Sequence, residues 1–376
     1  MKTIVSVMTG LLFISIAHAQ FSLEIENQNG YSSNSFANYK IQPDTYSIWS
    51  LQVRKDWIQQ ESGIRLYYQG NAGLYQSYND RNYHRQGLGV AYYRYLDTHQ
   101  TNMLYAEWSA SKRFHSEVYK WYETTDFDGY VNLKWAVMPQ LYLYTGLSLN
   151  GSQFKNLKAF SNWQHTLFLR LSRFFNSGTT IMAEIDIISK SYNPESLVET
   201  SELFPDVVTL GEGTSRQIAS MLKVAQSLGQ STGLSGQAMI RRNTSNSVRY
   251  LGASSGYYYT DEELFDDVFG YESEEFTLQL KSRIFWGITA ILGSNIRFKH
   301  YQNRLALDLE GMAFEDERLR DDTRSYSWIE LKRPLGLGTI PPLQISLRYG
   351  ILDNESNDPY YDYGSNYFSI SLGQEF

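Results

Sequence analysis

The sequence YGSNYFSISLGQEF, residues 363–376, decides the fold class of this chain. From Phe368 to Gly373, large apolar residues alternate with serine and glycine. A period of two places the apolar side chains on one face of a β-strand and the small or polar ones on the other. The strand is followed within a few residues by a terminal aromatic residue, Phe376. The stretch therefore predicts a single strand with one apolar and one polar face at the end of the sequence.

The same alternation recurs along most of the chain. Clear examples are Trp49–Arg54, Val131–Val137 and Leu141–Leu149, and a less regular one is Val248–Tyr259. Leu305, Leu307 and Leu309 also alternate with polar residues, which predicts a further strand. Roughly sixteen to eighteen such segments are expected. The pattern indicates an all-β protein.

The first residues predict a secretory signal. Lys2 supplies a positive start, the run from Ile4 to Ile16 is apolar, and Ala17-His18-Ala19 has the small-x-small form of a cleavage site. We therefore expect a signal peptide over residues 1–19 and a single folded domain over residues 20–376. The apolar run is too short to predict a membrane anchor.

Composition narrows the function classes. The formal charge is −7, which disfavours nucleic-acid binding, and the chain has no cysteine, which excludes disulfide and thiolate chemistry. Aromatic residues make up 15%, with 30 tyrosines, whereas proline counts only 8. Tyrosine-rich, proline-poor chains suit many long strands. After the signal no apolar run is long enough for a spanning helix, so membrane crossing would require a closed barrel.

Together, the signal, the repeated alternation and the final strand resemble bacterial outer-membrane β-barrel proteins of the porin-like kind. The resemblance implies a closed antiparallel up-and-down transmembrane β-barrel in the bacterial outer membrane, in contact with outer-membrane lipid and lipopolysaccharide. It also implies that the barrel-assembly machinery reads the closing strand through Phe368, Ile370, Leu372 and Phe376. A secreted tyrosine-rich β-sandwich or solenoid is the alternative that does not enter a membrane.

Short and long links are expected to alternate, with the short ones facing the periplasm. The link near Thr260–Glu275 breaks this expectation, because it is long yet falls on the short side. Residues 192–214 form a long link that either narrows the lumen or covers the surface. An aromatic girdle at strand ends is predicted from Tyr46, Trp49, Trp57, Tyr119, Trp121, Trp163, Trp286, Trp328, Tyr360 and Tyr361.

Charged residues on the polar faces of the strands are predicted to face the lumen, because Arg or Lys on the lipid side would cost about 2–4 kcal/mol near the midplane. The set leans basic and allows two interpretations: a water-filled pore that prefers anions or polar solutes, or a salt-bridged network that braces the barrel. Its members are Arg54, Arg65, Glu107, Lys134, Arg170, Glu184, Asp186, Lys281, Arg283, Arg297, Lys299, Glu330 and Arg348, with Lys190, Lys223, Arg241, Asp308, Glu310 and Lys332.

No motif predicts a cofactor, and the histidines show no metal-ligand spacing. Asp126-Phe127-Asp128-Gly129 resembles the start of a calcium loop but lacks its remaining ligands, so it predicts a turn. Gly252 to Gly256 matches a nucleophile-elbow pattern without the following helix.

The leading expectation is a channel for small polar solutes and not an enzyme. The alternatives are a structural or surface-interaction barrel, a membrane component of an export system, and a lipid hydrolase using Ser254 or His165.

Overall fold

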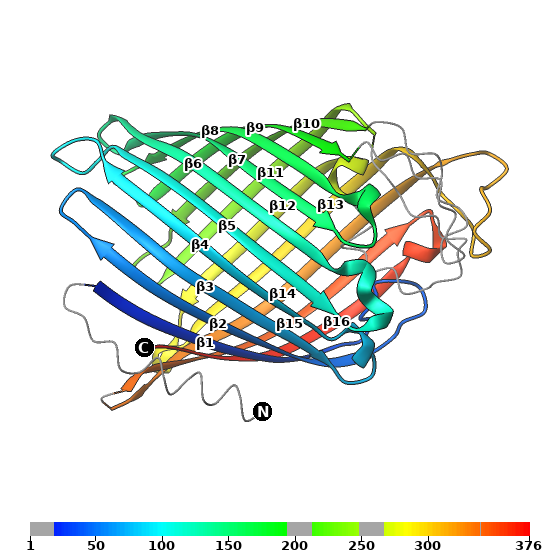
Figure 1. The fold of residues 1–376 in the computed structure, drawn as a ribbon, viewed down its shortest axis with the longest axis horizontal. Coiled ribbons are helices and arrows are strands. Elements are labelled where there is room, and N and C mark those ends of the chain that lie inside the picture. Colours follow the sequence, from blue (N-terminus) through cyan, green and yellow to red (C-terminus); the bar gives the residue numbers. More distant parts are fainter. Residues whose placement is uncertain (1–18, 194–212, 248–266, 339) are drawn as a thin grey trace.

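The chain folds into sixteen long strands within the residues that the computed structural model describes, 19–193, 213–247, 267–338 and 340–376 (Figure 1). Short 3₁₀ turns occur only in the links, for example η3 (Glu117–Tyr122) and η8 (Pro359–Tyr361). The strands are β1 Ala19–Ser32, β2 Asp44–Ile58, β3 Ser62–Tyr75, β4 Tyr83–Tyr95, β5 Met103–His115, β6 Thr124–Met138, β7 Leu141–Phe154, β8 Asn162–Phe174, β9 Thr179–Tyr192, β10 Thr214–Ser227, β11 Thr232–Ser245, β12 Tyr271–Arg283, β13 Thr289–Leu305, β14 Leu319–Leu337, β15 Ile340–Ser356 and β16 Tyr363–Glu375.

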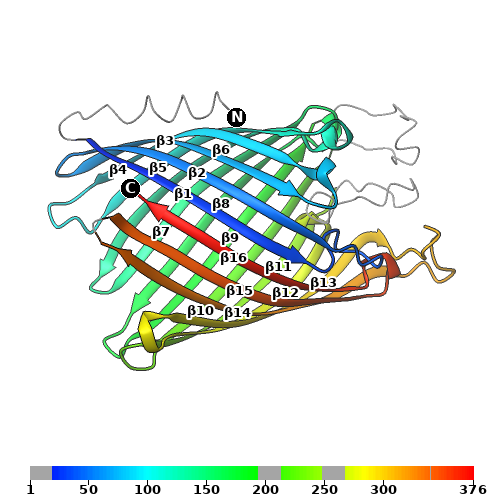
Figure 2. The same cartoon turned by 90° about the horizontal axis from the view of Figure 1, so that it is seen from below.

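The sheet closes on itself. Each strand pairs antiparallel with its neighbours in sequence, and β1 pairs with β16 from Glu24 opposite Glu375 to Ser32 opposite Tyr367. The two strands run side by side in Figure 2. Main-chain hydrogen bonds extend this seam to the last residue, from Leu23 N to Phe376 O (3.0 Å) and from Phe376 N to Leu23 O (2.8 Å). The prediction of a closed antiparallel barrel is confirmed, at the lower of the two expected strand numbers.

The strands carry their apolar side chains on the outer face. On β8, Leu167 and Leu169 are 53% and 49% exposed, whereas Phe168 between them is 7% exposed. The same alternation of exposed and covered positions runs along β9 and β10. Contact with lipid requires such an outer band of leucine, isoleucine and aromatic side chains. Closure of the sheet meets the second requirement, because the bilayer offers backbone N–H and C=O groups no hydrogen-bond partner. No helix in the described residues is long and apolar enough to span a membrane.

Successive links lie at opposite ends of the barrel, and most links at one end are shorter than those at the other. Both described ends of the chain and the short links lie at one end, and the long links gather at the other (Figure 1). The prediction that the long link near Thr260–Glu275 falls on the short side is wrong, because β11 ends at Ser245 and β12 begins at Tyr271 on the side of the long links. Barrels of this class turn their short links to the periplasm and their long links outward.

One predicted strand is absent and another lies outside the described residues. The run from Leu305 to Glu310 leaves the sheet at Leu305, and residues 306–318 form a link with one isolated bridge, Leu307 to Ala313. The cause is a side-chain turn: Asp308 Oδ1 accepts the backbone N–H groups of Glu310 (3.1 Å) and Met312 (2.8 Å). Asp308 and Glu310 therefore do not belong to the lumen wall. Val248–Tyr259 falls mainly in the part that is not described.

The aromatic girdle is correct only in part. Trp49, Trp57 and Trp163 lie on the outer face, 50%, 39% and 38% exposed. Tyr46 and Trp328 instead lie on the inner face, each over a glycine of a neighbouring strand. Three further members are buried in the long links: Tyr119, Tyr360 and Tyr361. Sheet propensity and packing over glycine therefore account for many of the aromatic residues that the sequence pattern assigns to the membrane interface.

Candidate functional site: the barrel lumen

The register places the predicted charged residues on the inner face of the strands. Each stands at a position whose parity is opposite to that of the exposed apolar side chains on the same strand. The residues so placed are Arg54, Arg65, Glu107, Lys134, Arg170, Glu184, Asp186, Lys281, Arg283, Arg297, Lys299, Glu330 and Arg348. Charged side chains on an inner face can either line an open pore or fill the lumen, and their pairing and exposure distinguish the two.

One side of the lumen, on β5 and β6, is acidic. Glu107 accepts hydrogen bonds from the hydroxyls of Tyr67 and Tyr105. Asp126 accepts from Ser152 Oγ (2.9 Å) and lies 3.5 Å from Arg85 Nη2. The neutral hydroxyls hold Glu107 in a fixed position without cancelling its charge, whereas Arg85 offsets part of the charge of Asp126.

Asp128 completes this acidic side. Asn150 Nδ2 donates to it at 2.7 Å and Ser109 Oγ at 3.4 Å, and both partners are neutral. No ion pair to Asp128 occurs in the part of the chain that the structure describes. The acidic side, defined as Glu107, Asp126 and Asp128, therefore carries more negative than positive charge.

The side built from β13, β14 and β15 is basic and aromatic. Arg297, Arg324 and Tyr326 line a recess of about 340 Å³, together with Asn295, Leu352 and Tyr367. Arg297 is paired with Glu275 at 2.7 Å.

Arg348 stands beside this recess. Its guanidinium lies 5.7 Å from the ring centre of Tyr326 and 5.6 Å from that of Trp328. Among the described residues no carboxylate pairs with Arg348, although Glu330 stands opposite it in the ladder. Arg297, Arg324 and Arg348 are named the basic side below.

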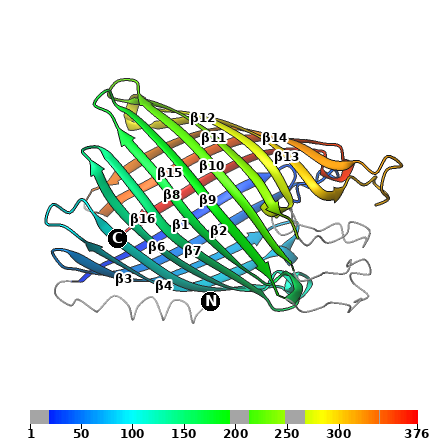
Figure 3. The same ribbon diagram turned by 90° about the horizontal axis from the view of Figure 1, so that it is seen from above.

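The two charged sides face each other across the barrel. Strands β6 and β14 stand eight places apart in a ring of sixteen, so half the circumference separates Asp128 from Arg324. Figure 3 shows such opposed walls, with β8–β10 crossing over β1, β2, β15 and β16. A field directed across the lumen follows from this arrangement, and it is strongest where low-dielectric walls confine the water.

Ion pairs span neighbouring strands between the two sides. Arg170 donates to Glu184, and Arg65 binds Asp56 through two bonds, of 2.7 and 3.0 Å. The side chain of Arg65 remains 45% exposed, which shows that free space adjoins it within the barrel. Lys299 is different: it is fully buried near the outer end, 4.0 Å from Asp322. The predicted set therefore contains both residues that reach open lumen and residues that brace the wall.

Sequence reasoning missed several charged residues of the lumen. The sequence pattern predicts a turn at Asp126 and Asp128 and places neither Arg85 nor Arg324 on a strand face. The overlooked signal is parity: Asp126 and Asp128 share the inner face with Tyr130, Asn132 and Lys134 of the same strand. Counting back from Lys134 in steps of two finds both carboxylates.

No catalytic site can be assembled from the candidates named earlier. His165 lies on the outer face beside Leu167, and Ser254 lies outside the described residues. The described residues contain no group of three or more side chains placed to hold a metal ion. The link 192–214, a candidate constriction, also lies almost wholly outside them.

The comparisons agree with the fold. The outer-membrane protein OpdK of Pseudomonas aeruginosa has a TM-score of 0.51 and 10% identity, over 95% of this chain and 99% of that one. OpdL of the same organism gives 0.51 and 10%, over 96% and 99%. Identities this low show a shared fold and nothing further.

A family model described as "Surface lipoprotein assembly modifier" matches residues 208–376, which is less than half of the chain. No curated protein matches. None of the descriptions names an enzyme. A closed antiparallel ring with an apolar outer surface satisfies its backbone groups internally, as a structure that spans a bilayer must. The chain is a closed β-barrel protein of the bacterial outer membrane, with sixteen strands in the residues that the structure describes.

Proposed function

We propose that this protein is a channel for small polar solutes. The observation that carries the proposal is the pair of opposed charged sides: Asp128 has no cationic partner on the acidic side and Arg348 has no anionic partner on the basic side, among the described residues. A wall that served only as a brace would pair its charges, because unpaired charges cost free energy unless water solvates them. Charges left for water or a solute suit a conducting lumen.

Conductance of the purified barrel in a planar bilayer tests the proposal. We expect a steady open channel whose preference for anions falls when Arg348 and Arg324 are both replaced by alanine. Arg318 provides a control outside the lumen, because it is an exposed arginine of the β13–β14 link that lies 3.8 Å from the ring centre of Phe314 and pairs with Asp316. The variant R318A should leave the ion preference unchanged. A barrel that is folded but silent contradicts the proposal.

A second candidate is a membrane component that assembles or exports surface lipoproteins. The family match over residues 208–376 favours it, since this segment includes β10 to β16 and therefore the basic side. Cells lacking the protein would then retain lipoproteins inside the outer membrane. Protease accessibility of lipoproteins on intact cells distinguishes the candidates: lost surface exposure together with a silent barrel supports assembly, and normal exposure with steady conductance supports the channel.

A further inference from the structure

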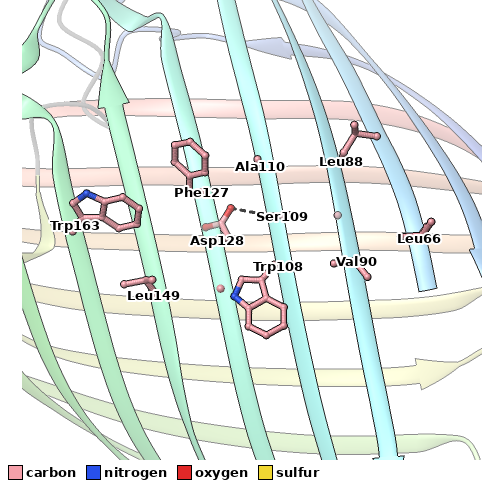
Figure 4. A pocket seen from close by; sticks show the side chains of 12 residues that line it. Leu66, Leu88, Val90, Trp108, Ser109, Ala110, Phe127, Asp128, Leu149 and Trp163 are labelled. Carbon is pink, nitrogen blue, oxygen red and sulfur yellow. Dashed lines mark hydrogen bonds between the residues drawn. The ribbon is translucent and has the colours of Figure 1, made fainter. Parts of the chain in front are cut away.

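The outer, lipid-facing surface contains a groove that runs over β3 to β8 (Figure 4). It encloses about 570 Å³, which lies in the size range of ligand pockets. Its ridges are the side chains of Leu88, Trp108, Phe127, Leu149 and Trp163, and its lining is almost wholly apolar. The groove is independent of the lumen and of the proposed channel.

Small residues make the floor of the groove. Ala110 and Gly129 stand on adjacent strands, and Trp108 lies across Gly129, with its Nε1 atom 3.1 Å from where a Cβ would be. The rings of Phe127 and Trp163 stack at 6.1 Å to form one ridge. The ridge side chains remain open to the surroundings: Leu88 is 67% exposed and Trp108 54%. A depression bounded by rings and branched chains offers an acyl chain more contact than a flat wall does.

The height of the groove places it in the outer leaflet. Strand β5 runs from the short-link end at Met103 to the long-link end at His115, and Ala110 lies past its middle. Lys112 follows two residues further, on the same outer face. With a strand tilt near 40°, Lys112 lies about 20 Å above Leu104, at the outer edge of an apolar band about 25 Å tall.

Lys112 gives this end of the groove a positive charge. Its ammonium group lies 5.0 Å from the ring centre of Phe114, which itself stacks on His84 at 4.7 Å. The neighbours of Lys112 across the ladders are Gln86 and Thr125, two neutral side chains on the outer face. Among the described residues Lys112 forms no ion pair. A cation at the lipid interface attracts anionic headgroups by about 1 kcal/mol.

We propose that the groove binds one lipopolysaccharide molecule of the outer leaflet, with an acyl chain against Ala110 and the indole ring of Trp108 and a phosphate at Lys112. The distance from floor to cation fits this division, because the apolar contacts lie directly beneath the charge on one strand. The leaflet fits as well, since the groove opens at the level that lipopolysaccharide occupies on the outward side of the barrel. The ligand that this site recognises therefore carries an anionic phosphate next to a saturated hydrocarbon chain.

Purified lipopolysaccharide titrated into the detergent-solubilised, folded barrel tests the proposal. The variant K112A removes the cation, and A110W fills the floor. Two controls match them elsewhere on the outer face. Lys55 lies 4.9 Å over the ring of Trp57 at the opposite rim, and Ala183 lies on β9 between Leu171 and Leu222. The control variants are therefore K55A and A183W. Heat-modifiable gel migration verifies that each variant has folded.

We expect K112A to bind lipopolysaccharide about fivefold more weakly than the native chain. A110W should also weaken binding, and K55A and A183W should leave it unchanged. Dephosphorylated lipopolysaccharide should bind the native barrel and K112A equally.

Three results would overturn the proposal. The first is equal weakening by K55A, which would indicate unspecific attraction to positive charge. The second is undiminished binding to both K112A and A110W. The third is a barrel whose dimer, detected by cross-linking, is lost in A110W while lipid binding persists, which would assign the groove to a second copy of the chain. Because the readout is lipid binding, failure here leaves the conductance test of the channel unaffected.

Discussion

Trp328 lies flat across Gly293 on the inner wall: a Cβ placed on Gly293 would stand 2.1 Å from the indole ring. The two residues face each other in the β13–β14 ladder. Tyr67 covers Gly89 in the same way, at 2.1 Å. A glycine opposite a ring lets the ring lie along the wall instead of projecting inward, and each pair gains cross-strand contact. The pairing explains why a barrel with so many tyrosines and glycines can retain space inside.

The contact between Trp328 and Gly293 predicts the effect of G293V. The added isopropyl group collides with the ring from its Cβ onward, so Trp328 must turn into the lumen or the ladder must yield, at a cost of about 1–3 kcal/mol. We expect earlier unfolding in denaturant titrations and a smaller single-channel conductance. Gly236 offers the control, because nothing lies within 4 Å of its Cβ position. If G236V destabilises the barrel as much as G293V, the ring contact is not the cause.

The acidic side predicts a change in ion preference. Replacing both Asp126 and Asp128 by asparagine keeps their shape and removes two negative charges from one wall. We expect reversal potentials in a salt gradient to shift toward anions, opposite in sign to the shift expected for loss of Arg348. E310Q, in the exposed β13–β14 link, should change nothing. An unchanged reversal potential in the double variant would show that ions do not pass this wall.

A contact between two long links predicts a local pH dependence. Lys155 Nζ donates to Glu123 Oε2 at 2.9 Å, and this bond holds the pKa of the Glu123 carboxyl below its ordinary value. A lowered pKa means that the contact stabilises the links above the ordinary pKa of glutamate and is lost as pH falls through the lowered one. The gain is a few tenths of a kcal/mol, because the Lys155 side chain is 65% exposed.

Amide hydrogen exchange of residues 116–123 and 155–161 measures this dependence. We expect the native chain and E123Q to differ at neutral pH and to converge in acid. E117Q alters a pair that solvent reaches freely, with Glu117 81% exposed, and should not reproduce the difference. A gap that persists at low pH would contradict the assignment to Glu123.

The terminal ring of Phe376 is predicted to act in assembly. The ring is 51% exposed, whereas the backbone N–H and C=O of the residue both bond to Leu23. F376S keeps those bonds, so we expect a folded barrel of unchanged melting temperature but a lower amount inserted in cells. Phe285, 65% exposed in a link at the same end, supplies F285S as the control. Equal insertion of F376S and native chain would remove Phe376 from the assembly signal.

Local alternation predicts the fold because lipid and water lie on opposite sides of each strand. Leu167 and Leu169 on β8 follow this rule, because both side chains face the lipid and the residue between them faces the lumen. The rule fails where a side chain bends the backbone: the leucines at 305, 307 and 309 alternate, yet Asp308 turns the chain there. Strand number therefore could not be settled by periodicity alone.

The lumen was less accessible to sequence reasoning. Parity placed Arg65, Glu184 and Arg348 on the polar face, but it does not say which residues share one wall. The placement of Asp128 opposite Arg324 depends on the total strand number, because eight strands are half the circumference of a ring of sixteen but less than half that of a ring of eighteen. The glycine–aromatic pairs depend on cross-strand register, which the alternation of a single strand does not contain.

The seam between β1 and β16 has a consequence for how the molecule forms. Every other ladder joins strands that follow one another along the chain, whereas this one joins Leu23 to Phe376. Contacts between such distant residues are the slowest to form in folding. Until they do, the nascent molecule is a curved ribbon with two unsatisfied borders, each able to recruit a foreign polypeptide. A chaperone that shields the free edges of β1 and β16 would thus be needed until the barrel closes.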